Sequence, residues 1–324
     1  MTTGEVPEHP HDPAFRCATW TKAHDVDPVG SSPEFDSLVL VECPLPWPHD
    51  ADEIPLLAGR TAPGTRVMAV VPEPHGGDRD DEDGDPRLRI VHHRRVRTNH
   101  LEGVDHLVTA ADAPALLDAL LADPQADSRG LPSAVGEAPP EVLVCAHGRR
   151  DPCCGRWGTL LHLELSALWS DVRLWRCSHS GGHRFAPTVT TLPDGRAWAW
   201  VEPPLVDEVV RRRGDVDAVA PFDRGSSALD PWCQAVEREV FRRQGWGWLD
   251  VGLTEARSSV AADGRTAEVV LTWPTGTARA TVEVRREVPV LTCGAPPEQA
   301  KKSSRELGVR DLDVGPVAVP VAGA

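Results

Sequence analysis

The spacing of apolar residues predicts a series of short strands and amphipathic helices from residue 37 onward. Continuous apolar runs of about four to eight residues are typical of buried strands, and apolar positions three or four residues apart are typical of helices. In the first part of the chain this pattern predicts strands at 37–42, 66–71, 87–93 and 106–109, and helices at 52–58 and 113–122. The acidic run at 78–85 interrupts the pattern and predicts a solvated loop.

A segment rich in proline, glycine and serine, residues 123–140, has no apolar periodicity and predicts a linker with a domain boundary near 135. Beyond it the pattern predicts the order βαβ followed by ββα, at 141–145, about 153–168 (helix), 172–177, 187–192, 196–201 and 205–213 (helix). The same order occurs more weakly in residues 37–122. The two halves are therefore predicted to be duplicated lobes of one architecture.

The last part of the chain predicts an extension rather than a third lobe. A helix is predicted at 231–243, followed by two long alternating strands at 265–273 and 277–288. The proline and small residues from about 295 predict a disordered end. We therefore expect an α/β protein with two lobes, divided into an N-terminal lobe at 1–135, a second lobe at 136–250, a β-hairpin extension at 251–294 and a disordered tail at 295–324.

Composition and charge exclude several classes of protein. The 324 residues include 34 Lys and Arg against 49 Asp and Glu, a formal net charge of −15 that repels phosphate backbones and anionic lipids, so we expect neither nucleic acid nor a membrane as a partner. The N-terminus shows no export signal and no run of about 18 apolar residues occurs, which predicts a cytoplasmic protein. Lys occurs only at Lys22, Lys301 and Lys302 and Tyr is absent, which excludes enzymes that need a phosphate-loop Lys, a core Schiff-base Lys or a catalytic Tyr.

Four of the eight cysteines lie between residues 145 and 177, which indicates metal or redox chemistry in that region. Cys145 ends a predicted strand. Asp151, Pro152 and Cys154 then fall at the N-cap, first and third positions of the next helix, because Asp accepts free N–H groups and Pro has none to leave unpaired. A helix N-terminus lowers the pKa of a thiol, so Cys154 is predicted to be a thiolate ligand or a reactive thiol.

Two histidines follow the next predicted strand. A glycine pair after His179 forms a tight loop that turns His183 back toward it. With Cys145 and Cys154 they give the spacing C-x8-C-x24-H-x3-H. Two thiolates and two imidazoles suit either Zn²⁺ or a [2Fe–2S] cluster with both histidines on one iron. A zinc finger has shorter spacings, and the long first loop suits a cluster that is wider than a single ion.

Other interpretations of these residues stay open. The C-x-H pairs that begin at Cys145 and Cys177 each match half of a Rieske motif, although the C-x2-H half does not occur. Cys153 and Cys154 are candidates for a thiol redox pair, although adjacent cysteines form only a strained ring when oxidised. The remaining cysteines are predicted to be small buried hydrophobic side chains: Cys17, Cys43, Cys233 and Cys293.

Four segments resemble the sucrase/ferredoxin-like family: LVLVECPLPWPHD at 38–50, CAHGRRDPCCGRWG at 145–158, WRCSHSGGHRFAPTVTTLPDG at 175–195 and RGSSALDPWCQAVE at 224–237. The resemblance implies that the second lobe is a thioredoxin-like ferredoxin domain. Fungal members of the family hold a [2Fe–2S] cluster through two Cys and two His with the C-x8-C and H-x3-H spacing. By position, the resemblance implies the ligands Cys145, Cys154, His179 and His183.

The segment RFAPTVTTLPDGR at 184–196 is also similar to the part of thioredoxin folds where a proline opens the third strand. In that fold this proline is usually cis and lies beside the redox site, which implies a cis peptide between Ala186 and Pro187. Two departures from the family pattern, Ala146 in place of Thr or Gly and LPWP in place of GPWG, remove no ligand.

We therefore predict an iron–sulfur protein that carries electrons to or from a redox partner protein. Two alternatives belong to other classes: a structural module that holds Zn²⁺ with the same four ligands, and a thiol oxidoreductase that uses Cys153 or Cys154. Hydrolysis of a glycosidic bond requires two facing carboxylates, and no motif in the sequence identifies such a pair. Sucrose cleavage is therefore not predicted.

Overall fold

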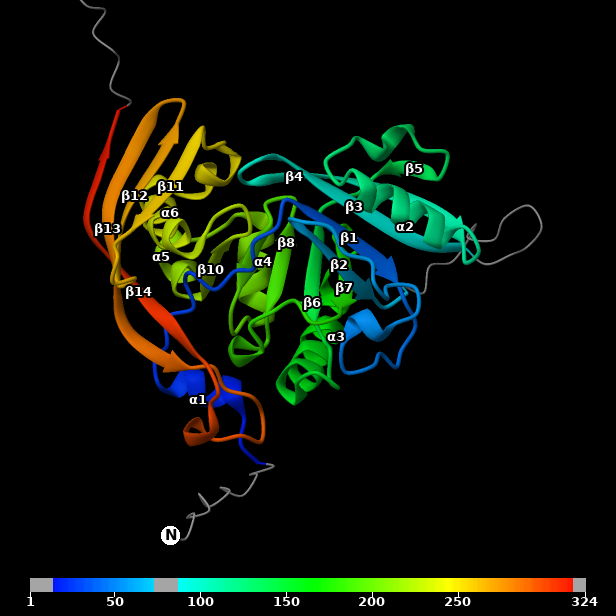
Figure 1. Ribbon diagram of the computed structural model, residues 1–324, viewed down its shortest axis with the longest axis horizontal. Coiled ribbons are helices and arrows are strands. Elements are labelled where there is room, and N and C mark those ends of the chain that lie inside the picture. Colours follow the sequence, from blue (N-terminus) through cyan, green and yellow to red (C-terminus); the bar gives the residue numbers. More distant parts are fainter. Residues whose placement is uncertain (1–13, 73–86, 317–324) are drawn as a thin grey trace, which may run out of the picture.

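The computed structural model describes residues 14–72 and 87–316, which form two α/β lobes on one large sheet with a smaller sheet beside them (Figure 1). The expected α/β class with two lobes is confirmed. The helices are Cys17–Ala23 (α1), Ala113–Ala122 (α2), Thr159–Leu168 (α3), Pro203–Arg211 (α4), Val216–Val219 (α5) and Pro231–Gln244 (α6). None of the described helices has the length and apolar character needed to cross a membrane. The acidic run at 78–85 lies outside the described residues.

The large sheet has the strand order β10-β9-β8-β6-β7-β2-β1-β3-β4-β5. The strands are Ser37–Glu42 (β1), Thr65–Val70 (β2), Arg87–Arg97 (β3), His100–Thr109 (β4), Ala134–Glu137 (β5), Glu141–Cys145 (β6), Arg173–Cys177 (β7), Val189–Leu192 (β8), Arg196–Trp198 (β9) and Asp223–Ser226 (β10). Each lobe has one parallel pair followed by antiparallel strands, in the orders β2-β1-β3-β4-β5 and β7-β6-β8-β9-β10. The predicted duplication is therefore confirmed. The lobes join where β2 pairs with β7, at Val70 and Cys177.

The second lobe has the predicted βαβ order followed by ββα. A π-helical turn, Cys154–Gly158, leads into α3, which connects the parallel strands β6 and β7. Parallel neighbours need such a crossover because the chain must return to the same edge of the sheet before the second strand begins. β8 and β9 form a hairpin that α4 follows. The peptide between Ala186 and Pro187 is cis, as predicted.

The connection between β1 and β2 differs from the prediction. The helix expected at 52–58 is wrong, and only a 3-10 turn forms at Ala51–Glu53. The physical reason is that Ile54 precedes Pro55, and a residue before proline avoids the helical region. Ile54 accordingly adopts an extended conformation and ends the turn.

Two other parts of the first half differ from the prediction. The expected linker at 123–140 contains a 3-10 turn, Ser128–Gly130, and the strand β5, which pairs with β4. This segment therefore belongs to the sheet of the first lobe. The short helix α1 was not predicted from the apolar pattern.

The smaller sheet has the order β11-β12-β13-β14, with the bounds Glu255–Val260, Thr266–Trp273, Gly276–Pro289 and Ser303–Gly315. β12 and β13 form the predicted hairpin. The disordered tail expected at 295–324 is wrong for residues 303–315, which form β14. This strand pairs along β13 and buries Leu307, so that β13 is not left as an open edge of the sheet. Residues 317–324 lie outside the described part of the chain.

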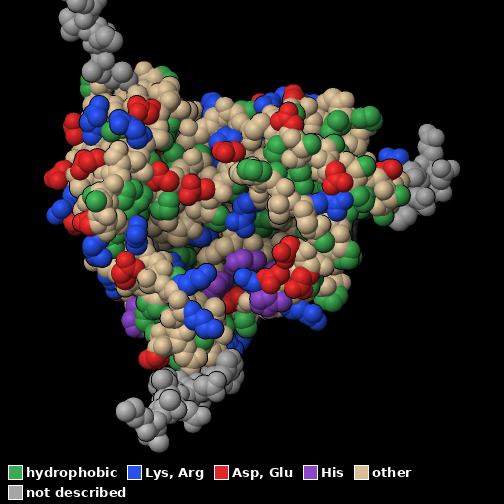
Figure 2. Space-filling view, in the orientation of Figure 1, with side chains coloured by type: hydrophobic (Ala, Val, Ile, Leu, Met, Phe, Trp, Pro, Cys, Tyr) green, Lys and Arg blue, Asp and Glu red, His purple; other side chains and the backbone are tan. Residues whose placement is uncertain are grey.

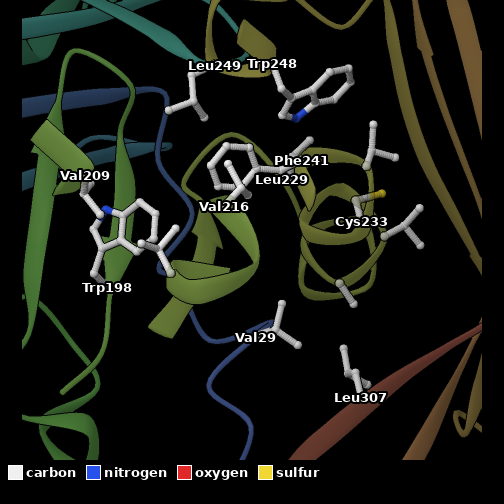
Figure 3. Packing of buried hydrophobic residues seen from close by; sticks show 14 of the residues in the cluster. Val29, Trp198, Val209, Val216, Leu229, Cys233, Phe241, Trp248, Leu249 and Leu307 are labelled. Atoms are coloured by element: carbon white, nitrogen blue, oxygen red, sulfur yellow. The ribbon is translucent and has the colours of Figure 1, made fainter. Parts of the chain in front are cut away.

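The largest hydrophobic cluster joins the second lobe to the smaller sheet. It contains residues from α4, α6, β12 and β13. Figure 3 shows Phe241 of α6 and Trp248 within this cluster. Trp248 also packs edge-on against Trp273 of β12, with ring centroids 5.0 Å apart. A shared apolar core therefore fixes the smaller sheet to the second lobe.

Arg196 of β9 is buried between two carboxylates, Asp223 of β10 and Glu237 of α6, and forms an ion pair with each. All three side chains have 0% exposure. The indole Nε1 of Trp248 also donates to Glu237, at 2.5 Å. Because buried charges are stable only when they are paired and hydrogen bonded, this cluster requires β9, β10 and α6 to keep their relative positions.

Arg196→Met is expected to lower the free energy of unfolding by about 3–5 kcal/mol, because both carboxylates then stay buried without a cation. Denaturant unfolding followed by circular dichroism measures the change. Arg257→Met is the matched control, since Arg257 pairs with Glu255 on the surface, where such pairs contribute at most about 1 kcal/mol. Equal losses of stability in the two variants would contradict the prediction.

Candidate functional site

The site begins at the carboxyl ends of two parallel strands. Cys145 is the last residue of β6 and Cys177 is the last residue of β7, and the two residues are in register. Both side chains are buried. His179 follows β7 by two residues. Ligand sites of α/β proteins commonly lie just beyond the carboxyl ends of such strands.

The helix that follows β6 begins directly against the end of that strand. Asp151 Oδ1 accepts hydrogen bonds from the backbone N–H groups of Cys153 (2.9 Å) and Cys154 (3.3 Å), so the predicted capping by Asp151 is confirmed. At Gly158 a Cβ atom would lie 2.0 Å from the carbonyl oxygen of Cys145, an approach that only glycine permits. This packing places Cys154 next to Cys145.

The Cys145 thiol contacts two of the other predicted ligands. A hydrogen bond from the Cys154 thiol, and a weaker effect of the His179 ring, hold the pKa of Cys145 well below its ordinary value despite its burial. The hydrogen bond to Cys145, together with burial, raises the pKa of Cys154 well above its ordinary value. The lowered pKa that the helix N-terminus predicts for Cys154 is therefore wrong, because its burial and its hydrogen bond to Cys145 raise that pKa, and Cys145 is the thiol of the pair whose pKa is lowered.

The two histidines are brought together by a loop of left-handed glycines. Gly181 has a φ of 88° and Gly182 a φ of 79°, so the chain reverses between His179 and His183, whose ring centroids lie 5.7 Å apart. His183 Nε2 donates to the carbonyl oxygen of Leu291 at 2.7 Å, which leaves Nδ1 as its unprotonated nitrogen when the ring is neutral. His179 Nδ1 is buried and has no hydrogen-bond partner among the described residues.

Three arginines surround these side chains. Arg66 Nη2 donates to the carbonyl oxygen of His179, and Arg224 Nη1 donates to the carbonyl of the first loop glycine, both at 3.1 Å. Burial lowers the pKa of Arg224 to about 9 and that of Arg184 to about 10. Burial also lowers the pKa of Arg66. The positive charge of an arginine side chain favours the ionised form of a nearby thiol.

The histidine side of the site is open to solvent. His179 and His183 are only half-buried, whereas Cys145 and Cys154 are fully buried. Figure 2 shows histidine side chains at the surface near the lower centre of the face in view, with arginine or lysine side chains next to them. The histidine side is therefore the more exposed side of the site.

His147 and Cys177, the other members of the two C-x-H pairs, lie beside the site. The His147 ring bonds through Nε2 to the carbonyl oxygen of Pro48 at 2.7 Å and packs edge-on against Trp47. Burial raises the pKa of the Cys177 thiol well above its ordinary value. His147 is therefore oriented by the first lobe, and Cys177 is a neutral thiol.

The adjacent Cys153 contacts a different set of residues. Its Sγ lies 3.1 Å from the Sγ of Cys293, which lies 3.5 Å from the Sγ of Cys17. Asp151 Oδ2 lies 3.5 Å from Cys17 Sγ, and Asp151 Oδ1 lies 3.6 Å from Cys293 Sγ. Cys17 is buried in a hydrophobic cluster, as predicted, and the half-buried Cys293 packs against the same cluster. The tertiary fold also groups both with Cys153, which was not predicted.

No signal in the sequence marks this second group, because its members come from opposite ends of the chain and have no motif spacing. Cys43 and Cys233 are also buried in hydrophobic clusters, as predicted. Within the second group, burial raises the pKa of the Asp151 carboxyl to about 6, and the neighbouring Cys293 adds to the effect.

The two groups differ in compactness. Cys17, Asp151, Cys153 and Cys293 form a compact set, because one ligand atom from each lies within 4.8 Å of the others. No other set of three or more His, Cys, Asp or Glu side chains in residues 14–72 and 87–316 meets this limit. The set at Cys145 does not meet this limit. Its ligand atoms are therefore farther apart than those of the group that contains Cys153.

Comparison with protein families gave a match over more than half of the chain. A family model described as Sucrase/ferredoxin-like matches residues 28–225, which include both lobes and the four predicted ligands. Cys17 and Cys293 lie outside the matched region. Searches of curated proteins and of solved structures gave no match.

Gly182→Ala is expected to destabilise the protein more than Gly59→Ala. Both glycines have left-handed φ angles, 79° and 73°, in which alanine costs about 1–2 kcal/mol. At Gly182 the new Cβ would also lie 2.4 Å from the Arg224 guanidinium, whereas at Gly59 no described atom lies within 4 Å. Urea unfolding should show an additional loss of about 1–3 kcal/mol for Gly182→Ala. A loss equal to that of Gly59→Ala would mean that the loop and Arg224 move apart freely.

Proposed function

This chain belongs to the sucrase/ferredoxin-like family, and from that premise we propose that it is an electron-transfer protein with a [2Fe–2S] cluster bound by Cys145, Cys154, His179 and His183. The observation that carries the proposal is the meeting of two thiols and two imidazoles beyond the end of β6. Cys145 contacts both Cys154 and His179, and the His183 ring lies next to that of His179. Two thiolates on one iron and two imidazoles on the other is a known ligand set for such a cluster.

The chemistry of the side chains fits this cofactor. Thiolates are the usual ligands of iron in these clusters, and the pKa of Cys145 is already lowered. His179 offers an Nδ1 that is buried without a partner, and His183 offers its Nδ1 because Nε2 donates to Leu291. A hydrogen bond on the far nitrogen fixes the orientation and the tautomer of a ligating imidazole.

The width of the group favours a cluster over a single zinc ion with the same ligands. The ligands of one tetrahedral Zn²⁺ lie about 2.0–2.3 Å from the ion and therefore no more than about 4 Å from one another. The side chains around Cys145 do not form so compact a set, whereas those around Cys153 do. A cofactor with two bridged irons needs the larger space.

When bound, a [2Fe–2S] cluster supplies one-electron redox chemistry. The chain contributes the two thiolates, the cationic surroundings of Arg66, Arg184 and Arg224, and the open histidine side. Electrons pass most readily where a partner can approach closely, which favours the half-buried His179 and His183 as the side of contact. We infer a cytoplasmic redox partner protein that docks on this side.

The thiol oxidoreductase alternative has less support. Cys153 and Cys154 are both fully buried, and their sulfurs face different groups of side chains. A thiol nucleophile must be accessible to its substrate, and a redox pair must have its two sulfurs within bonding reach.

The absorption spectrum and metal content of anaerobically purified protein test the proposal. We expect a brown protein with sulfide-to-iron bands and about two irons per chain, and Cys145→Ser should lose most of the iron. Cys43→Ser is the matched control, because Cys43 is also buried but lies in the core of the first lobe. A colourless protein that contains zinc would favour the structural zinc module. Loss of iron in His147→Ala but not in His183→Ala would mean that His147 is a ligand in place of His183.

The reduction potential is expected to fall as the pH rises from about 6 to 10. Each ligating ring keeps a proton on its other nitrogen, and the electron gained on reduction raises the affinity for that proton. Electron uptake is then linked to proton uptake, with a limit of about 60 mV per pH unit for one proton per electron. Voltammetry across this range measures the slope. A potential independent of pH, as expected for ligation by cysteines alone, would contradict ligation by either histidine.

A further inference from the structure

A second set of metal-binding side chains lies beside the proposed cluster site. Cys17, Asp151, Cys153 and Cys293 form the thiol–carboxylate group, whose four ligand atoms all lie within 4.8 Å of one another. The group joins three segments that are far apart in the sequence: α1, the start of the helix after β6, and the loop between β13 and β14. Figure 1 shows α1 next to this loop, and a backbone hydrogen bond of 3.1 Å joins the loop to the residues before α1.

We propose that the thiol–carboxylate group binds one Zn²⁺ ion, at a site separate from the one at Cys145. In a tetrahedral site with bonds of about 2.3 Å, neighbouring ligand atoms lie about 3.8 Å apart. Cys293 Sγ lies 3.1 Å from Cys153 Sγ and 3.5 Å from Cys17 Sγ, and the two oxygens of Asp151 lie 3.5 Å from Cys17 Sγ and 3.6 Å from Cys293 Sγ. Small shifts of the side chains reach the tetrahedral geometry, since one ligand atom from each of the four residues already lies within 4.8 Å of the others. Thiolate and carboxylate are both common ligands of zinc, and thiolates select it over harder cations such as Mg²⁺ and Ca²⁺.

A bound cation would stabilise the ionised side chains of this group, because most of them are buried. Cys17, Asp151 and Cys153 are buried next to apolar residues. Ionised side chains in such surroundings are stable only beside an opposite charge, and a divalent cation supplies it to all of them at once.

Backbone N–H groups already orient the ligand atoms. Those of Cys153 and Cys154 donate to Asp151 Oδ1, and those of Cys17 and Cys153 donate to the sulfur of Cys293. Hydrogen bonds of this kind hold the ligands of a metal in position before the ion arrives.

The ion would connect both ends of the chain to the helix that carries Cys154. The loop that contributes Cys293 also contains Leu291, whose carbonyl accepts the hydrogen bond from His183. Zinc binding therefore holds in place a histidine of the neighbouring site. The two sites share no ligand, so a substitution at Cys145 removes no ligand of the zinc ion.

Zinc and iron analysis of the purified full-length protein and its variants tests the proposal. After incubation with ZnCl₂ and removal of free metal, the wild-type protein should retain about one zinc per chain. Cys17→Ser and Cys293→Ser should each weaken zinc binding at least about tenfold in competition with a chromophoric chelator. Cys233→Ser is the matched control, because Cys233 is buried in a different cluster. The zinc content of Cys145→Ser shows whether the ion is bound at the neighbouring site instead.

Zinc that is kept in Cys145→Ser and Cys233→Ser but lost in Cys17→Ser and Cys293→Ser supports the proposal. Zinc lost only in Cys145→Ser would overturn it and assign the ion to the neighbouring site. Folded wild-type protein that binds no zinc would also overturn it, as would a Cys153–Cys293 disulfide found by mass spectrometry in such protein.

Circular dichroism checks the folding of each variant. Cys293 is only half-buried, so its replacement disturbs packing least and carries the test if Cys17→Ser does not fold. Iron content is measured in the same samples. Protein that passes the zinc test but contains no iron would refute the proposed electron-transfer function and leave the zinc site standing.

Discussion

The arrangement of both groups of cysteines depends on one close contact between a helix and a strand. At Gly158 the helix after β6 approaches the carbonyl oxygen of Cys145 so closely that a Cβ atom would lie 2.0 Å from it. Any side chain at this position would push the helix away from the strand. The contact holds the start of the helix at the carboxyl end of β6. Cys154 is therefore within hydrogen-bonding distance of Cys145.

The start of the helix also separates two adjacent cysteines. Successive residues of a helix point about 100° apart, so Cys153 and Cys154 face different sides. Cys154 faces Cys145, whereas Cys153 faces Cys293. Asp151 caps the helix through one oxygen and contacts the thiols of the second group only. Two neighbouring residues thereby contribute their thiols to two different groups of side chains.

The smaller sheet completes both groups from outside the two lobes. β13 has 14 residues, and an extended strand of that length spans about 45 Å, enough to reach from the apolar core around Trp248 to the site. The loop between β13 and β14 then supplies the Leu291 carbonyl to His183 and the Cys293 thiol to Cys153. A backbone hydrogen bond from Gly294 to Phe15 holds this loop beside the residues before α1. Part of the site is therefore supplied by a segment outside the two lobes.

The sequence by itself determined the order of most strands, the duplication of the lobes and the helix cap at Asp151, because periodicity and local backbone chemistry encode these features. Motif spacing and family resemblance also singled out the four candidate ligands around Cys145. Only the tertiary structure decided that residues 303–315 form a strand, since a strand is stable only where a neighbour accepts its backbone hydrogen bonds. It also decided that Cys293 meets Cys17 and Cys153, which lie 276 and 140 residues away in the chain. No spacing encodes contacts between such distant residues, because the direction of each sulfur is set by the packing of the whole fold.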